Sequence, residues 1–224
     1  MSGKLIAWLK RRAQHALAML EDLLAPRGMK CLCCDNASEG MRLCPECSDK
    51  LNELRLPMRE GDIQHAWAYR GIAKQLVMAL KYDCSADSGM QMAQGMAEVA
   101  ERMSLPADVI LTWVPMPDGR RRARGIDHGR LLCERTAELL GLEAKQFLVR
   151  KRNSPTQRSL NGFMRRLNLK HAFSCAQRCN GSILLIDDVY TTGTTTHECA
   201  EALKRSGADR VFVLTATRVL RDKS

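Results

Sequence analysis

The sequence contains no apolar run near the roughly 20 residues that a membrane-spanning helix needs. Near the N-terminus, Lys10, Arg11 and Arg12 interrupt the only apolar stretch that could form the core of a secretory signal. The chain also shows no internal repeat and no low-complexity linker. These absences argue against a membrane-spanning, secreted or repeat protein. We therefore expect a cytoplasmic globular protein, which the 45% hydrophobic and 27% charged content supports.

Aromatic residues are scarce as well, because Phe, Tyr and Trp make up only 4% of the chain. In the most basic segment, residues 115–170, and just beyond it, only Phe147, Phe163 and Phe173 are candidate stacking platforms for bases. Single-strand binders gain about 1–3 kcal/mol from each stacked base. If this segment binds nucleic acid, we expect phosphate contacts to dominate, so that affinity ignores base sequence and falls steeply with salt.

Positive charge is abundant and unevenly spread. The formal net charge is +10, and residues 115–170 carry fourteen Lys or Arg against five Asp or Glu. A concentrated positive field favours polyanions, namely phosphorylated small molecules, nucleic acid or an anionic membrane. A solvated basic surface without a ligand is the alternative.

Cysteine is also plentiful, with ten residues, a pattern that in such a chain indicates metal binding rather than a disulfide framework. Cys31-x-x-Cys34 is followed, after nine residues, by Cys44-Pro-x-Cys47. Two such pairs place four thiolates where they can surround one Zn²⁺ tetrahedrally at about 2.3 Å. We predict a structural zinc site with these four ligands; four cysteines without a metal are the alternative. Cys33 is left over, because pairing it with Cys31 would leave one residue between ligands.

The hydrophobic pattern predicts three parts: an N-terminal amphipathic helix in residues 1–28, a four-cysteine zinc module in 29–55 and an α/β domain in 60–224. In the last part, apolar strand runs alternate with helices, which predicts a parallel α/β sheet. The expected strands are 63–69, at an edge, and 108–115, 182–187 and 210–217. The expected helices are 71–82, 88–103 with Asp87 or Ser88 as cap, 127–141 between Asp127 and Gly141, and 195–208.

Two acids and a Thr/Gly run stand at the end of the strand expected over 182–187. Asp187 and Asp188 precede Thr191, Thr192, Gly193, Thr194 and Thr195, which lead into a helix. Ligands of open α/β sheets bind outside the carboxyl ends of strands. Free N–H groups at a helix N-terminus, with threonine hydroxyls beside them, favour a phosphate. The acids suit vicinal hydroxyls or Mg²⁺, so a sugar phosphate fits both halves; a buried strand with capping acids is the alternative.

A second candidate site follows the strand expected over 108–115, in the run "VPMPDGRRRARG". Pro115 and Pro117 stiffen a tight loop, and Gly119 lets a ligand approach the backbone. Arg120, Arg121, Arg122 and Arg124 add positive charge, and the planar guanidinium binds oxyanions in a bidentate manner. We expect this loop to hold a pyrophosphate that faces the ribose held by the first site.

These motifs resemble those of a known fold family. "ILLIDDVYTTGTT" at 183–195 resembles the phosphoribosyl-pyrophosphate motif of type I phosphoribosyltransferases, and "VPMPDG" at 114–119 resembles their pyrophosphate loop. Together with the Cys-x-x-Cys pairs, "LKY" at 80–82, "RRRARG" at 120–125, "SPTQRSL" at 154–160 and "RRLNLKHAF" at 165–173, they resemble the ComF family of competence proteins over roughly residues 30–218.

The resemblance implies a type I phosphoribosyltransferase-like domain and specific site roles. Asp187 and Asp188 would be the catalytic pair that holds the ribose hydroxyls or Mg²⁺. Residues 191–195 would hold the 5′-phosphate, and Pro115, Met116, Arg120 and Arg124 the pyrophosphate. The family pattern has Arg-Gly-Phe-Asn-Gln where residues 124–128 read Arg-Gly-Ile-Asp-His, so charge and hydrogen bonding differ beside this loop.

The family's role, as the resemblance implies, is natural transformation, in which incoming single-stranded DNA is handled with cytoplasmic partners such as the DNA-uptake ATPase or a recombination mediator. Candidate DNA contacts are Arg121, Arg122, Arg152, Arg158, Arg165 and Arg166. Three functions stay open: a competence protein that binds single strands and phosphoribosyl pyrophosphate with Mg²⁺, an active phosphoribosyltransferase with an unidentified acceptor, and a zinc-stabilised interaction module with a vestigial site.

Overall fold

The computed structural model describes residues 30–34, 36–38, 41–150 and 172–220. The helix predicted over 4–24 and the predicted DNA contacts Arg152, Arg158, Arg165 and Arg166 lie outside the described residues. The chain forms two compact units, residues 1–49 and 50–224, and each is described by itself. In the part of the chain that the structure covers, no helix combines the length and the apolar character that crossing a membrane requires.

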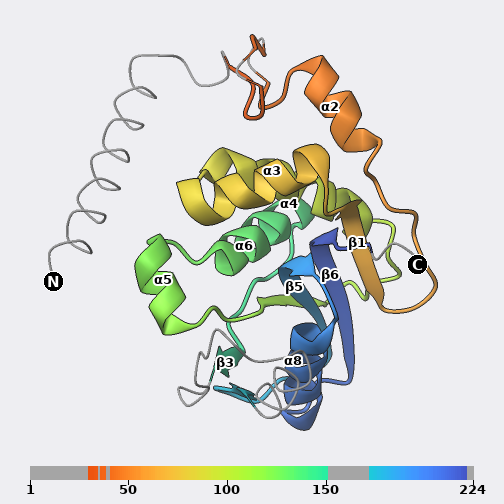
Figure 1. Ribbon diagram of the computed structural model, residues 1–224. Helices are drawn as coiled ribbons and strands as arrows, with labels where there is room; N and C mark the ends of the chain where they lie inside the picture. Colours follow the sequence, from red (N-terminus) through yellow and green to blue (C-terminus); the bar gives the residue numbers. More distant parts are fainter. Residues whose placement is uncertain (1–29, 35, 39–40, 151–171, 221–224) are drawn as a thin grey trace, which may run out of the picture. The chain divides into compact units, whose positions relative to one another are not determined.

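The second unit is built on a four-stranded parallel sheet with the order β1-β6-β5-β2. Its strands are β1 (Ile63–Ala68), β2 (Ile110–Trp113), β5 (Ser182–Tyr190) and β6 (Arg210–Arg218). The parallel sheet confirms the predicted α/β fold class, and β1 lies at an edge as predicted. β1 is nevertheless buried on both faces from Gln64 onward, because helices cover the sheet (Figure 1).

Helices lie on both faces of this sheet (Figure 1). α4 (Ala86–Ala100) and α6 (His128–Leu140) pack on one face, and α8 (Thr194–Arg205) packs on the other. α3 (Gly71–Met78) continues directly into a π-helical turn, η1 (Ala79–Asp83). The remaining described elements are α2 (Pro45–Asn52), α5 (Asp118–Arg124) and the antiparallel pair β3 (Leu148–Arg150) and β4 (Phe173–Cys175).

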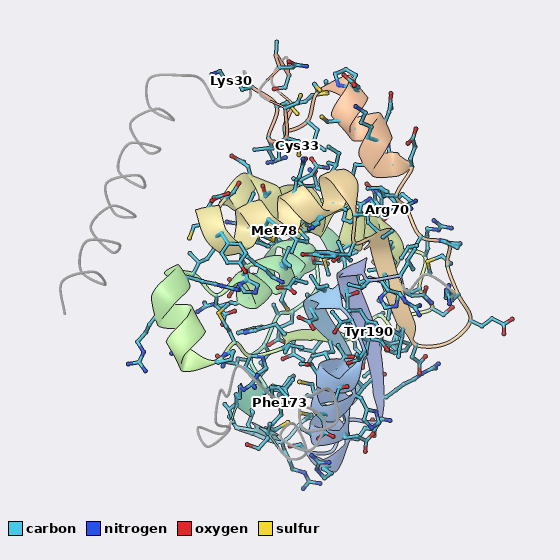
Figure 2. All side chains as sticks on the ribbon, viewed as in Figure 1. Lys30, Cys33, Arg70, Met78, Phe173 and Tyr190 are labelled. Atoms are coloured by element: carbon cyan, nitrogen blue, oxygen red, sulfur yellow. The ribbon has the colours of Figure 1, made fainter. Side chains whose placement is uncertain are left out.

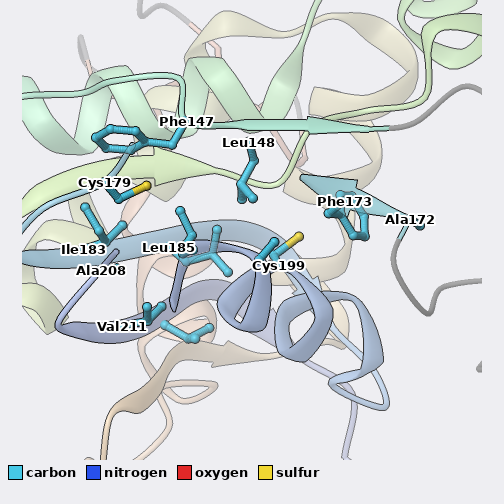
Figure 3. Packing of buried hydrophobic residues seen from close by; sticks show 13 residues of the cluster. Phe147, Leu148, Ala172, Phe173, Cys179, Ile183, Leu185, Cys199, Ala208 and Val211 are labelled. Atoms are coloured by element: carbon cyan, nitrogen blue, oxygen red, sulfur yellow. The ribbon is translucent and has the colours of Figure 1, made fainter. Parts of the chain in front are cut away.

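The apolar core explains why the central strand reads as an unbroken hydrophobic run. Residues 183–186 of β5 are all fully buried, since both faces of the strand are covered. On the α8 side, Ile183 and Leu185 pack with the small β3–β4 sheet and α8 (Figure 3). Phe147 and Phe173 belong to this cluster and are each only 2% exposed. Their prediction as stacking platforms for bases was therefore wrong, and Phe163 lies outside the described residues.

Several element boundaries differ from the sequence-based expectations. Ser85, rather than Asp87 or Ser88, caps α4, because its side chain accepts a hydrogen bond from the Ser88 N–H. The arginine run expected in a loop forms the short helix α5. Asp127 caps α6 as predicted by accepting a hydrogen bond from the Arg130 N–H, and α6 stops at Gly141, which takes the left-handed conformation.

A close approach between α4 and β1 depends on a glycine. A Cβ at Gly95 would lie only 2.1 Å from the nearest ring atom of Trp67, which is buried. The Arg55 guanidinium lies 4.7 Å from the centre of the same ring and donates a hydrogen bond to the Gly95 carbonyl. Any side chain at this position would force the rigid indole to move.

Candidate functional site

A pocket of about 390 Å³ lies beyond the carboxyl ends of β2 and β5, where ligands of open α/β sheets bind. Side chains and backbone from both predicted sites line it. Of the predicted site residues, the lining includes Pro115, Met116, Arg124, Asp187, Asp188, Thr191 and Thr195. Its other lining residues are Tyr69, Lys81, Val114, Pro117, Asp127, His128, Gly129, Arg150, Val189 and Val219.

The two acids lie within β5 rather than at its end, since the strand continues to Tyr190. Asp188 is only 7% exposed and accepts contacts from two donors. Lys81 Nζ lies 2.8 Å from its Oδ1, and His128 Nε2 lies 2.7 Å from its Oδ2. Asp187 Oδ1 accepts a hydrogen bond from the Asp188 N–H at 2.9 Å. One carboxylate is therefore clamped by basic groups, and the other is held mainly by the backbone.

The electrostatic surroundings push the pKa values of the two acids apart. Burial and the adjacent charge of Asp188 raise the pKa of Asp187 well above its usual value. Burial alone would also raise the pKa of Asp188, but the His128 hydrogen bond and the Lys81 charge lower it below its usual value. The surroundings of Asp188 thus favour its ionised form, whereas those of Asp187 oppose ionisation.

The threonine-rich loop ends at the N-terminus of α8, where the first N–H groups lack partners within the helix. Gly193 takes a positive φ of 76° directly before α8, and a Cβ there would lie 2.2 Å from the Tyr190 hydroxyl oxygen. Tyr190, labelled in Figure 2, packs in turn against His65. Thr191 and Thr195 line the pocket, while the hydroxyl of Thr192 lies 2.9 Å from that of Thr194.

The arginines after β2 are divided by helix α5. Arg124, in its last turn, lines the pocket, and its Nη1 lies 3.5 Å from both ring nitrogens of His128. Arg121 and Arg122 lie on the exposed side of the helix, and the side chain of Arg120 lies outside what the structure describes. The structure therefore brings only some of the predicted arginines to the pocket.

Three basic pocket residues were not predicted as site residues: Lys81, His128 and Arg150. Lys81 belongs to the "LKY" run, but nothing in the sequence shows that it contacts an acid 107 positions away. His128 is a residue where the chain departs from the family pattern, and this departure was the signal that could have found it. Only its position at the start of α6 turns it toward Asp188.

The first unit brings four cysteine sulfurs together. The Sγ atoms of Cys31, Cys34, Cys44 and Cys47 all lie within 4.8 Å of one another, so this group could hold a metal ion. A tetrahedral ion with four sulfurs at ~2.3 Å requires neighbouring sulfurs about 3.8 Å apart. The Cys34 and Cys44 sulfurs are 3.6 Å apart, which fits that geometry. Cys33 is outside this group.

Local backbone geometry favours the thiolate form of one of these cysteines, Cys31. Burial alone would raise the pKa of Cys31, but backbone N–H groups of Cys44, Cys33 and Cys34 lower it to about 6. Burial raises the pKa of Cys33 to about 12, which keeps its thiol protonated. Cys44 directly precedes Pro45, the first residue of α2, so the cluster adjoins a helix N-terminus.

Solved structures with a similar fold are phosphoribosyltransferases, at low identity. Glutamine phosphoribosylpyrophosphate amidotransferase from B. subtilis aligns with a TM-score of 0.41 and 18% identity, over 62% of this chain and 30% of that chain. Adenine phosphoribosyltransferase from Leishmania tarentolae aligns with a TM-score of 0.43 and 13% identity, over 72% of this chain and 94% of that chain. Likeness at this level says nothing about activity.

Sequence relatives are closer, although no protein-family model matches the chain. DNA utilization protein YhgH of Salmonella typhi is 30% identical over 207 residues, which cover 86% of this chain and 91% of the relative. Competence protein F of Haemophilus influenzae is 32% identical over 122 residues, which cover 52% of each chain. The chain therefore belongs to the competence protein F (ComF) family, which includes the DNA utilization proteins YhgH.

Proposed function

We propose that this protein acts in DNA uptake or utilization by binding phosphoribosyl pyrophosphate with Mg²⁺ in the pocket and single-stranded DNA through basic side chains. The observation that carries the first half is that one pocket holds two acids, a helix N-terminus and an arginine. Each group matches one part of the ligand. The acids suit the ribose hydroxyls, the start of α8 suits the 5′-phosphate, and Arg124 suits the pyrophosphate.

Asp187 and Asp188 are the residues that would hold Mg²⁺, which would neutralise charge on the pyrophosphate. Carboxylate oxygens are the donors that Mg²⁺ prefers, and both acids line the pocket, so the residues present fit this ion. Lys81 and His128 already occupy the two oxygens of Asp188. Binding of the ligand must therefore compete with these two contacts.

The names of the relatives support the DNA half of the proposal, since they concern DNA utilization and competence. Arg121 and Arg122 are exposed on α5, and we propose that they contact phosphates of the strand. Arg152, Arg158, Arg165 and Arg166 stay predicted contacts. Partners such as a DNA-uptake ATPase or a recombination mediator are part of the same proposal. We also propose that the cysteine cluster holds Zn²⁺ in a structural role, because four sulfurs leave no open position for a substrate.

An active phosphoribosyltransferase is the second candidate. What favours it is that the acids and Arg124 share one pocket, as a transfer from ribose C1 with departure of pyrophosphate requires. The chain's own contribution would be to position the ribose and to stabilise the charge of the departing pyrophosphate. Release of pyrophosphate with a nucleobase present would distinguish this candidate from simple binding.

Two titrations test the proposed function. Calorimetry with phosphoribosyl pyrophosphate and Mg²⁺ should show tighter binding than with ribose 5-phosphate or pyrophosphate alone, because the whole ligand fills both halves of the pocket. Fluorescence anisotropy with a labelled oligonucleotide should show affinity that falls steeply between 50 and 200 mM salt. Absence of binding in both titrations would refute the proposal.

A further inference from the structure

Tyr82 stands out because a large aromatic ring is left in solvent. Among the described residues it is the only aromatic side chain in the exposed large hydrophobic set, and it is 61% exposed. The Arg124 guanidinium carbon lies 5.1 Å from the centre of its ring. An open ring beside a guanidinium is the combination on which a planar heterocycle stacks.

The backbone around Tyr82 has an unusual conformation. Tyr82 lies in the π-helical turn η1, and Cys84 directly after the turn takes a φ of 56°. Cys84 is the only non-glycine residue with positive φ in the part of the chain that the structure describes. Its thiol donates to the Arg124 carbonyl at 2.9 Å, which ties η1 to the end of α5. π-Turns and left-handed non-glycine residues are costly and often mark functional sites.

This turn couples the ring to the pocket. The residue before Tyr82 is Lys81, which points to Asp188 at 2.8 Å. On the other side, Arg124 contacts both the Tyr82 ring and His128, and His128 contacts Asp188. Contacts on both sides thus join the exposed ring to Asp188, which lines the pocket. Tyr82 is not itself among the lining residues, but its neighbour Lys81 and the Arg124 guanidinium beside its ring both line the pocket, which places the ring next to the pocket wall.

We propose that Tyr82 and Arg124 form a nucleobase platform at the rim of this pocket. The inference rests on the proposed function: if the pocket binds the phosphates and the sugar of a ligand, a base is the group that would lie beside Tyr82. Phe147 and Phe173 cannot serve, because both are buried in the core. The same base chemistry can come from two molecules. One is a free purine or pyrimidine that enters beside phosphoribosyl pyrophosphate, and the other is a single strand whose phosphates bind nearby arginines.

The test compares Tyr82→Ala, Tyr82→Trp and a matched control, Leu139→Ala. Leu139 is an exposed apolar residue of α6, 46% exposed, that does not line the pocket. The first probe is a labelled (dT)12 strand beside an abasic strand of equal length, which has the same phosphates but nothing to stack. The second probe is a set of free adenine, guanine, hypoxanthine and uracil, titrated with phosphoribosyl pyrophosphate and Mg²⁺ present.

If the base comes from a strand, Tyr82→Ala should weaken (dT)12 binding by about 5- to 150-fold for one stacked base and leave abasic binding unchanged. If it is a free base, the same loss should appear with at least one free base and not with the strand. Tyr82→Trp should retain binding in either case, and Leu139→Ala should behave as the wild type.

The platform is overturned if Tyr82→Ala matches Leu139→Ala for every probe, or if it weakens (dT)12 and the abasic strand equally. In both results the wild type still binds a strand or phosphoribosyl pyrophosphate, so the proposed function survives. A wild type that binds none of the probes refutes the proposed function and the platform together.

Discussion

Replacing Lys81 by Met should destabilise the protein, because it removes the principal charge partner of a buried carboxylate. Lys81 Nζ lies 2.8 Å from Asp188 Oδ1, and the two side chains are only 17% and 10% exposed. Met has a similar length and apolar stem, so the change removes the ammonium group without opening a large cavity. His128 stays in contact with Asp188 and retains part of the stabilisation.

The expected loss in the free energy of unfolding follows from the burial of the Lys81–Asp188 pair. At an effective dielectric constant of about 20, two unit charges at this distance attract each other by about 6 kcal/mol. Two effects make the net loss of stability smaller than this attraction. The variant no longer has to desolvate an ammonium group on folding, and His128 still contacts Asp188. Breaking buried pairs costs about 3–5 kcal/mol in general. We therefore expect a loss near the lower end, about 3 kcal/mol.

Urea unfolding followed by circular dichroism measures this loss as a lower midpoint with an unchanged slope. A double-mutant cycle with Asp188→Asn isolates the pair, because Lys81→Met should cost at least about 1 kcal/mol less once the acid is neutral. A loss below about 1 kcal/mol for Lys81→Met, together with additive single effects, would refute the reasoning about this contact.

Three further predictions concern other parts of the chain. Cys44→Ser should reduce bound zinc to well below one ion per chain and unfold residues 30–50, while Cys33→Ser retains the metal. Metal analysis measures the zinc and hydrogen exchange the unfolding, and a full zinc content in Cys44→Ser would contradict the ligand assignment. Gly95→Ala should destabilise by about 1–3 kcal/mol, because its Cβ would meet an indole ring, whereas Gly89→Ala in the same helix meets a flexible leucine and should be nearly neutral in thermal unfolding. Burial lowers the pKa of His65 to about 4, so this residue should contribute about 3 kcal/mol to the free energy of unfolding above pH 6.5, and the contribution should be lost as pH falls toward 4. The stability of His65→Gln should vary less with pH over that range, and equal pH profiles of the two proteins would contradict this.

The His65 prediction depends on a defined tautomer. The Thr215 hydroxyl donates to the Thr217 carbonyl at 3.1 Å, which leaves its oxygen to accept from His65 Nδ1 at 2.8 Å. Nδ1 therefore carries a proton, and because burial lowers the pKa of His65 to about 4, the other ring nitrogen is unprotonated at neutral pH. Protonation of the other ring nitrogen would bury a charge near Arg218 and Arg59, both of which lower the pKa. Stability is thus complete above the unfolded pKa and declines as pH falls toward the folded one.

Features with a local chemical cause could be predicted from the sequence. Asp127 and Gly141 bound α6 as expected, since a side-chain cap and a left-handed stop act within a few residues. The cap of α4 was missed because Ser85, Asp87 and Ser88 are all good caps within one turn, and only the backbone decides among them. The parallel sheet followed from long apolar runs, which require burial on both faces.

Features that depend on tertiary contacts could not be predicted. Lys81 meets Asp188 only because η1 and β5 come together in the fold. The π-turn has no signal in the hydrophobic spacing, since it adds one residue to a helix that otherwise reads normally. The arginine run suggested an anion-binding loop, but helix α5 directs Arg124 to the pocket and Arg121 and Arg122 to solvent. Charge density along a sequence does not show which side chains share a surface.

The central claim is that the pocket still binds a ribose phosphate ligand. Thermal unfolding of the zinc-loaded protein, with and without phosphoribosyl pyrophosphate and Mg²⁺, tests it directly beside the Asp187→Asn/Asp188→Asn variant. Ligand at a hundred times its Kd stabilises by about 2.7 kcal/mol, which corresponds to a rise of about 5–10 °C for a chain of this size. We predict this rise in the wild type and its loss in the double variant, each measured against its own ligand-free midpoint. No rise in the wild type at millimolar ligand would contradict the account and mean that the basic surface acts without this pocket.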